Sequence, residues 1–154
     1  MKREILVINC GSSSIKFSLF NYLDDLFTLA LHGQIDALGL NAQLTFKDPA
    51  QSSISRVDIA PSSDHAAALQ AFLHWLEPRL DVEAQLIVGH RVVHGGSHYH
   101  RPTLVNETVL DKLKDIIPLA PLHLPHNILA IERLAQLRPD LTQVACFDTA
   151  FHST

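Results

Sequence analysis

The sequence contains little cysteine, no long apolar run and no cluster of basic residues. Its two cysteines, Cys10 and Cys146, lie far apart and lack the spacing of a metal-binding or redox pair, so we expect free thiols in a reducing cytoplasm. No apolar run approaches the length of a membrane-spanning helix, and residues 5–8 (ILVI) are too few for a signal peptide. These absences predict a soluble cytoplasmic protein with no membrane partner.

The charge of the chain argues against another class of partner. The formal net charge at pH 7 is −4, and without a Lys/Arg cluster this does not favour binding to nucleic acid. The 154 residues are 47% hydrophobic and 18% charged, as in folded rather than disordered proteins. A chain of this length can bury one substantial core, so we expect a single domain.

Hydrophobic periodicity predicts strands first, followed by alternating helices and strands. Residues 5–9, 15–20 and 27–36 have the patterns of three strands in an antiparallel meander. The other expected elements are a peripheral ribbon (41–47 and 53–60), a helix from His65 that Pro78 ends or bends, a buried strand (85–93), a helix capped by Asn106, a non-helical proline-rich segment (118–125), a helix (127–137) and a last strand (142–147). The order β-β-β-α-β-α-β predicts an α/β fold with a mixed sheet whose later strands are parallel.

Polar residues follow three of the apolar strands. Asn9, Arg91 with His94, and Asp148 stand at or just beyond the strand ends. In α/β sheets ligands bind beyond the carboxyl ends of the strands, so we expect these side chains to converge on one edge.

The first two strands enclose a turn suited to phosphate. Asn9, Ser12, Ser14 and Lys16 supply an amide, two hydroxyls and a positive charge, and Gly11 lets the backbone approach closely. The pattern is not a Walker loop, because GxxxxGK[ST] is absent and a strand follows rather than a helix. Read alone, the pattern favours a hairpin turn that binds nothing over a phosphate site.

Arg91 and Asp148 are the strongest charged candidates. A guanidinium within a strand is costly unless it is paired or faces a ligand, and its planar fork matches carboxylate or phosphate; an internal salt bridge is the alternative. Asp148, at the end of the last strand, could hold Mg²⁺ or orient a nucleophile; a helix N-cap is the alternative.

Histidines are frequent near the middle of the chain, where residues 90, 94, 98 and 100 are all histidine. No cysteine or acidic residue completes a zinc pattern there, so we favour separate polar and loop roles. His123 stands in a rigid proline-rich loop and could donate a hydrogen bond to a transferring phosphoryl group. His152 follows Asp148 closely enough to share its pocket. Ordinary surface or core positions are the alternative for each.

Four motifs, in order and spacing, resemble the acetate kinase (acetokinase) family. They are NCGSSSIKF from residue 9, VGHRVVHGG from residue 88, APLHLPHN from residue 120 and FDTAFH from residue 147. The resemblance implies a ribonuclease H-like half-domain of the actin/Hsp70/sugar kinase superfamily. It also implies reversible, Mg²⁺-dependent phosphoryl transfer from ATP to acetate, giving acetyl phosphate and ADP. A propionate or butyrate kinase, or a catalytically silent phosphate-binding domain, is the alternative.

The resemblance also implies roles for individual residues. Asn9, Ser12, Ser14 and Lys16 would bind phosphate or ATP; Arg91, His123 and Asp148 would be catalytic; Asn9 and Asp148 would serve Mg²⁺; and Arg91, Val93, Leu122 and Phe151 would contact the substrate. A carboxylate is already nucleophilic, so such a site needs charge neutralisation and in-line placement more than a strong base. A branched side chain at Val93 suits acetate, but one methylene changes binding by only about 1–3 kcal/mol.

Members of this family are more than twice as long as this chain. By resemblance, residues 1–154 form an amino-terminal domain that is incomplete at its end, while an absent second domain would carry the adenosine site and much of a homodimer contact. We therefore expect little or no acetate kinase activity from these 154 residues alone. We also expect apolar surface beside the last strand, and an effect of Leu124, often Asn in the family, on how His123 is held.

Overall fold

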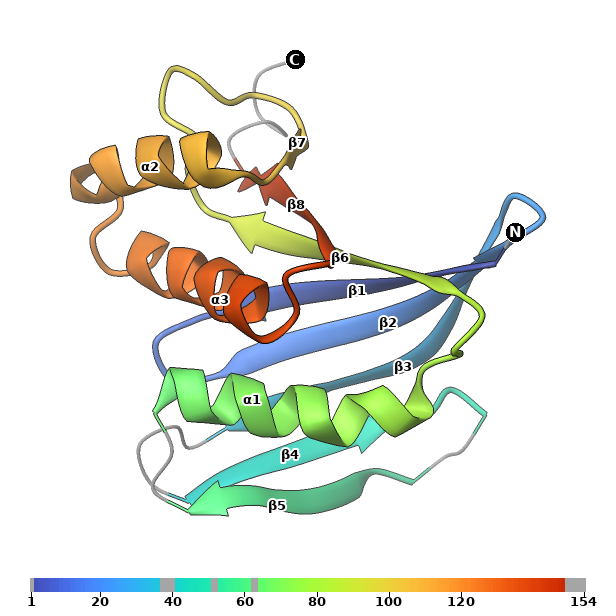
Figure 1. The fold of residues 1–154 in the computed structure, drawn as a ribbon. Helices are drawn as coiled ribbons and strands as arrows, with labels where there is room; N and C mark the ends of the chain where they lie inside the picture. Colours follow the sequence, from blue (N-terminus) through green and yellow to red (C-terminus); the bar gives the residue numbers. More distant parts are fainter. Residues whose placement is uncertain (1, 37–40, 51–52, 62–63, 149–154) are drawn as a thin grey trace.

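One mixed sheet organises the chain, and the helices lie on one side of it (Figure 1). The computed structural model describes residues 2–36, 41–50, 53–61 and 64–148. Within these residues the sheet has eight strands in the order β5-β4-β3-β2-β1-β6-β8-β7. The strands are β1 (Arg3–Cys10), β2 (Ile15–Leu23), β3 (Leu26–Asp36), β4 (Asn41–Lys47), β5 (Ser55–Pro61), β6 (Gln85–Val92), β7 (Thr103–Leu104) and β8 (Thr142–Phe147).

The sheet joins an antiparallel half to a parallel half at β1. Strands β1 to β5 pair in succession as an antiparallel meander. On its other edge β1 pairs with β6 in parallel, and β6 pairs with β8 in parallel. The predicted mixed sheet and parallel later strands are therefore confirmed. The predicted peripheral ribbon, β4 and β5, forms one edge of the sheet, where β4 pairs with β3.

Two of the helices, α1 and α2, begin where the sequence supplies capping residues. A carboxylate oxygen of Asp64 accepts from the Ala67 N–H at 2.8 Å at the start of α1 (His65–Leu76). The Asn106 side chain accepts from the Val109 N–H at 2.8 Å at the start of α2 (Glu107–Asp115). Such caps satisfy N–H groups that have no partner within the helix. As expected for Pro78, a short 3₁₀ turn (Glu77–Arg79) follows α1.

Two elements differ from the sequence prediction by more than small shifts of strand ends. The helix α3 (Leu124–Leu137) starts three residues earlier than expected, with Pro125 in its first turn. Proline fits there because first-turn N–H groups have no partner within the helix. Strand β7 was not predicted, because its two residues are too short to show a pattern. The predicted non-helical segment (118–125) is therefore wrong for its last two residues, which belong to α3, while the part before α3 contains only a 3₁₀ turn (Ile117–Leu119).

Alternating side chains divide the sheet into two faces. We call the side that carries α1, α2 and α3 the covered face and the other side the open face. On the covered face, Leu6, Ile8 and Val88 are fully buried, and they join α1 in the larger of two hydrophobic clusters. On the open face, Val7 of the same strand β1 is 39% exposed. No helix in the described part of the chain is long and apolar enough to cross a membrane.

Candidate functional site

The hairpin between β1 and β2 forms as predicted. The Gly11 N–H donates to the Ser14 carbonyl at 2.9 Å, which closes the turn. The hydroxyl-bearing Ser12 is exposed and Ser14 is half-buried. Just before and after the turn, Asn9 and Lys16 are direct cross-strand partners. Directly opposed residues have their Cβ atoms roughly 5 Å apart, so the amide and the ammonium group can reach one ligand.

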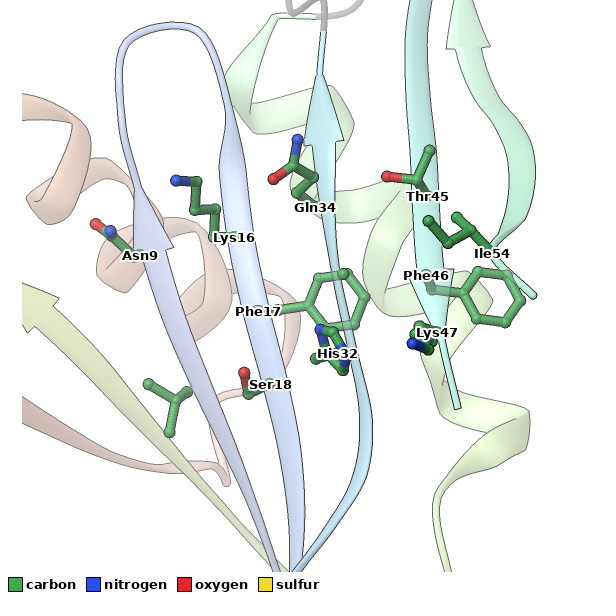
Figure 2. Close-up of a pocket in the computed structure, with 12 residues that line it drawn as sticks. Asn9, Lys16, Phe17, Ser18, His32, Gln34, Thr45, Phe46, Lys47 and Ile54 are labelled. Carbon is green, nitrogen blue, oxygen red and sulfur yellow. The ribbon is translucent and has the colours of Figure 1, made fainter. Parts of the chain in front are cut away.

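A row of polar side chains crosses the open face near the carboxyl ends of the parallel strands. We call Gln34, Lys16, Asn9, Arg91 and Asp148 the polar row. Gln34 pairs with Lys16, and Lys16 pairs with Asn9; Figure 2 shows these three on adjacent strands. The parallel register of β1 and β6, in which Ile8 pairs with His90, brings Arg91 next to Asn9. The row therefore joins three of the residues that the sequence predicts at this edge, Asn9, Arg91 and Asp148, whereas His94 is not part of it.

Arg91 and Asp148 form an ion pair at the end of the polar row. The Arg91 Nε donates to Asp148 Oδ1 at 2.8 Å, and their side chains are 57% and 27% exposed. The hydrogen bond to Asp148, and then its negative charge, raise the pKa of Arg91. Only one edge of the guanidinium and one carboxylate oxygen take part in this contact, so both groups keep capacity for a ligand. The salt-bridge alternative and the ligand-binding prediction are thus compatible.

A hollow of about 530 Å³ lies on the open face beside Asn9 and Lys16 (Figure 2). Its lining also includes Ser18, His32 and Lys47 from β2, β3 and β4. Its lining thus combines two lysines and several neutral polar groups with apolar side chains, among them Val7 and Ile54.

The parallel half of the open face is apolar. A groove of about 420 Å³ runs over Ile5, Ile87, Val144 and Cys146, and it ends at Arg91 and Asp148. The first four of these residues are half-buried, whereas the covered-face residues that directly follow them on the same strands are buried. This agrees with the expected apolar surface beside the last strand. The two cysteines are free thiols as predicted, and burial raises the pKa of Cys10 to about 12.

The residues predicted for the acetate methyl group are less closely gathered. Val93 is half-buried and packs against the second hydrophobic cluster, whereas Leu122 is 74% exposed. His123 is exposed and immediately precedes α3, where no side chain caps the helix. The predicted residues Phe151 and His152 lie outside the described residues.

The central histidines have separate roles, as the sequence favoured. His90 is 1% exposed on the covered face and donates from Nε2 to the Gln143 side-chain oxygen at 2.6 Å. Burial lowers the pKa of His90 to about 4, so the ring is neutral near pH 7. His94 accepts from the Gly96 N–H at 2.7 Å, and His98 and His100 are exposed.

Two residues that the sequence patterns did not single out hold the hairpin. Asn127 of α3 donates from Nδ2 to the Cys10 carbonyl at 3.0 Å. His65 of α1 donates from Nε2 to the Gly11 carbonyl at 2.8 Å. The available signal was an amide at a core position of α3: Asn127 shares its buried face with Leu124, Ile128 and Ile131.

The oxygen donors at this edge fit Mg²⁺. Mg²⁺ is usually held in kinase sites by one or two carboxylates together with substrate phosphates. Asp148 has a carboxylate oxygen that the ion pair with Arg91 leaves free, and Asn9 offers an amide oxygen in the same row. Among the residues that the structure describes, no group of three His, Cys, Asp or Glu could form an all-protein metal site.

Known proteins match this chain over nearly its whole length. The model of the acetokinase family matches residues 4–154. Acetate kinases of Rhizobium meliloti and Streptomyces avermitilis are 43% and 41% identical to this chain over 150 and 154 residues. These matches cover 96% and 98% of this chain but 38% of each relative.

Solved structures show the same fold. A propionate kinase from Francisella tularensis superposes with a TM-score of 0.85 at 35% identity, covering 99% of this chain and 38% of that one. The acetate kinase of Porphyromonas gingivalis gives 0.84 at 31% identity, covering 97% and 38%. The predicted α/β fold, with the mixed sheet of the actin/Hsp70/sugar kinase superfamily, is confirmed. The chain spans about 38% of the length of these relatives.

Proposed function

Because this chain belongs to the acetokinase family, we propose that it provides one wall of an acetate kinase cleft in the cytoplasm. The proposed reaction is reversible transfer of the γ-phosphoryl group of ATP to acetate, giving acetyl phosphate and ADP. The polar row at the carboxyl edge of the parallel strands, ending in the Arg91–Asp148 ion pair, carries the proposal. Because the chain spans about 38% of its relatives, the complete reaction is proposed for it together with a second domain.

The polar row suits the charge changes of phosphoryl transfer. Three equatorial oxygens of the moving group share negative charge, so the site must supply positive charge and fixed hydrogen-bond donors. Lys16 and the Ser12 and Ser14 hydroxyls would hold the phosphates of ATP, and Arg91 would bind the acetate carboxylate or the group in flight. His123, with its exposed ring, would donate to the same group.

Asp148 and Asn9 would hold Mg²⁺, which when bound would neutralise phosphate charge and orient the phosphates. Asp148 would also keep the Arg91 fork aimed at the substrate through their 2.8 Å hydrogen bond. The acetate carboxylate needs no strong base, because it is a nucleophile at pH 7.

Ligand binding by this part of the proposed cleft can be tested on the 154-residue chain itself. Titration of ¹⁵N-labelled protein with acetyl phosphate, and separately with inorganic phosphate, should shift the amide signals of residues 11–14. Arg91→Ala should weaken binding at least about tenfold, because charge-assisted hydrogen bonds contribute about 1.5–3 kcal/mol. Arg3→Ala is the matched control, since Arg3 is also exposed on a parallel strand but stands at its opposite end. Equal weakening by both variants would contradict the proposal.

Turnover is a separate question from binding. We expect the 154 residues to produce little or no acetyl phosphate from saturating Mg-ATP and acetate, because no adenosine site is proposed within them. Binding without turnover would support a wall of a kinase cleft. The silent-domain alternative would instead require that a longer chain, carrying the second domain, also fails to turn over.

A propionate kinase is the second candidate, favoured by the structural match to a propionate kinase at a TM-score of 0.85. The branched side chain of Val93 would limit the room beside the methyl group, which favours the shorter acid. Titration with acetyl phosphate and propionyl phosphate compares the two acids on the same protein. A Val93→Ala variant should shift the preference towards propionyl phosphate, by a factor of about 10–200 at most.

A further inference from the structure

Asn127 occupies a place where an apolar side chain would be expected. It lies in the first turns of α3, on the face that buries Leu124 and Ile128, and it is 3% exposed. A buried amide is costly unless its donor and acceptor atoms both find partners. Here both do: Nδ2 donates to the Cys10 carbonyl at 3.0 Å, and Oδ1 accepts from the Val93 N–H at 3.1 Å.

These two bonds join segments that are far apart in the sequence. Cys10 is the last residue of β1 before the phosphate turn, and Val93 follows β6 two residues after Arg91. The backbone adds a third segment, because the Asn127 N–H donates to the His123 carbonyl at 3.3 Å. One residue thus contacts the hairpin, the strand end that carries Arg91 and the loop that carries His123.

The next carbonyl of the turn is held from another helix. His65 of α1 donates to the Gly11 carbonyl, and its ring stacks on His126 of α3 with ring centroids 4.5 Å apart. Two consecutive carbonyls, of Cys10 and Gly11, are therefore fixed by side chains from the starts of two helices. This fixes the orientation in which the chain enters the turn.

We propose that Asn127 is a positioning residue that sets the phosphate turn and the Arg91–Val93 segment at a fixed separation. The proposal rests on the proposed function, because it assigns the two segments to one site. The phosphates of ATP at the turn and the acetate carboxylate at Arg91 must be held in register for transfer, and misplacement by about 1 Å can reduce the rate of a reaction a hundredfold. A shared amide fixes that separation directly, because both bonds end on the same planar group.

The two bonds can be separated by substitution. Asn127→Asp keeps an oxygen for the Val93 N–H but places a second oxygen against the Cys10 carbonyl, which only accepts. Asn127→Ala removes both bonds. The structure offers a matched control in Gln143, which is 5% exposed and also joins two segments through its amide. It accepts from His90 and donates to the Ile131 carbonyl at 3.2 Å, and neither of these bonds involves the hairpin.

The test is amide hydrogen exchange on the ¹⁵N-labelled chain, read at Gly11 and Val93. Asn127→Ala should speed exchange at both sites at least tenfold beyond the change in global unfolding. Asn127→Asp should speed exchange at Gly11 while Val93 stays protected. Gln143→Ala, corrected in the same way, should leave both sites as in the unmodified chain. Equal protection at Gly11 in the Asn127 and Gln143 variants would overturn the proposal.

Two further measurements test the role of Asn127 if the variants fail to fold or if the chain binds no phosphate. In the unmodified chain the Asn127 side-chain amide protons should exchange slowly, and fast exchange would overturn the proposal even if the variants failed to fold. Inorganic phosphate should bind at least tenfold more weakly to Asn127→Asp than to Gln143→Ala. If the unmodified chain binds no phosphate, the proposed function fails on this chain, whereas the exchange data still decide the role of Asn127.

Discussion

The two faces of the sheet use polar residues in opposite ways, although both are built from the same strands. Consecutive residues of β6 illustrate this: His90 points to the covered face and is 1% exposed, while the Arg91 side chain on the open face is 57% exposed. The His90 ring donates a hydrogen bond to the side-chain amide oxygen of Gln143, and the Gln143 amide nitrogen donates in turn to the Ile131 carbonyl. Arg91 bonds Asp148 through one nitrogen and keeps its other donors.

The difference separates groups that hold the fold from groups that can bind a ligand. Buried polar groups on the covered face, such as His90, Gln143 and Asn127, have protein partners, and removing a partner costs stability. Charged groups on the open face contribute little to stability, because water screens them. Substitutions on the two faces should therefore affect different measurements.

The largest effect on stability is expected in the covered-face core. Phe72 of α1 is fully buried, and the centroid of its ring lies 4.6 Å from the ring centroid of Phe17. Phe72→Ala should lower the free energy of unfolding by about 3–5 kcal/mol, because it removes buried apolar surface and leaves a cavity. Urea denaturation measures the loss. A loss below about 1 kcal/mol would mean that the covered face is not the main core.

Acidification should destabilise the covered face through His90. Its pKa is about 4 in the folded chain, because burial disfavours the charged ring, against 6.5 for an ordinary histidine. Below pH 6.5 the unfolded chain binds a proton that the folded chain rejects, so stability falls as the pH drops from 6.5 to 4. The loss should approach about 3 kcal/mol near pH 4.

Urea denaturation at a series of pH values measures this loss, with His90→Gln as the control. Glutamine retains a donor for Gln143 but does not titrate, so most of the slope between pH 6.5 and 4 should disappear. A smaller slope should remain, because burial and then the neighbouring His65 and His123 lower the pKa of His126. An unchanged slope in the variant would show that His90 is not the group responsible.

The strands show how much of the structure could be predicted from the sequence. The final strand (Thr142–Phe147) and the β4 range (Asn41–Lys47) were predicted with their observed bounds, because apolar alternation and flanking turns define them locally. The residues 85–92 are apolar on both sides, so their pattern did not reveal that His90 and Arg91 face opposite environments. The contacts of Asn127 with Cys10 and Val93 join positions 117 and 34 residues apart, which no local pattern encodes.

The convergence of Asn9, Arg91 and Asp148 was predictable for a physical reason. Parallel strands place their carboxyl ends at one edge, so polar residues after such strands must lie near one another. The extension of the row to Gln34 depends on the antiparallel register of β2 and β3. That register was not determined by the sequence pattern alone.

Removing the Asp148 carboxylate from the polar row should have a smaller effect, which we expect in the affinity for phosphate rather than in stability. Asp148→Asn removes a negative charge beside Arg91 and weakens their ion pair. Without Mg²⁺, inorganic phosphate should then bind about two- to fivefold more tightly, because less charge opposes it. Stability should change by less than about 1 kcal/mol, since the pair is partly exposed. Titration in the presence of EDTA measures the affinity, and weaker binding would contradict an anion site at Arg91.

Substitution of Val7 on the open face should have the smallest effect on stability. The same substitution on the covered face then allows a direct comparison of the two faces. Val7→Thr replaces a methyl group by a hydroxyl of nearly equal size where the side chain is 39% exposed, so water can hydrogen-bond the hydroxyl. The expected change in unfolding free energy is within about 0.5 kcal/mol.

Val88→Thr makes the same replacement on the covered face, where the side chain is fully buried. The two sites are close, because Leu6, next to Val7, pairs with Val88 across β1 and β6. A buried hydroxyl without a partner costs about 1–3 kcal/mol, so Val88→Thr should lower stability by at least 1 kcal/mol more than Val7→Thr. Equal losses would mean that Val7 is covered in solution, and that the open face of these parallel strands is occupied there.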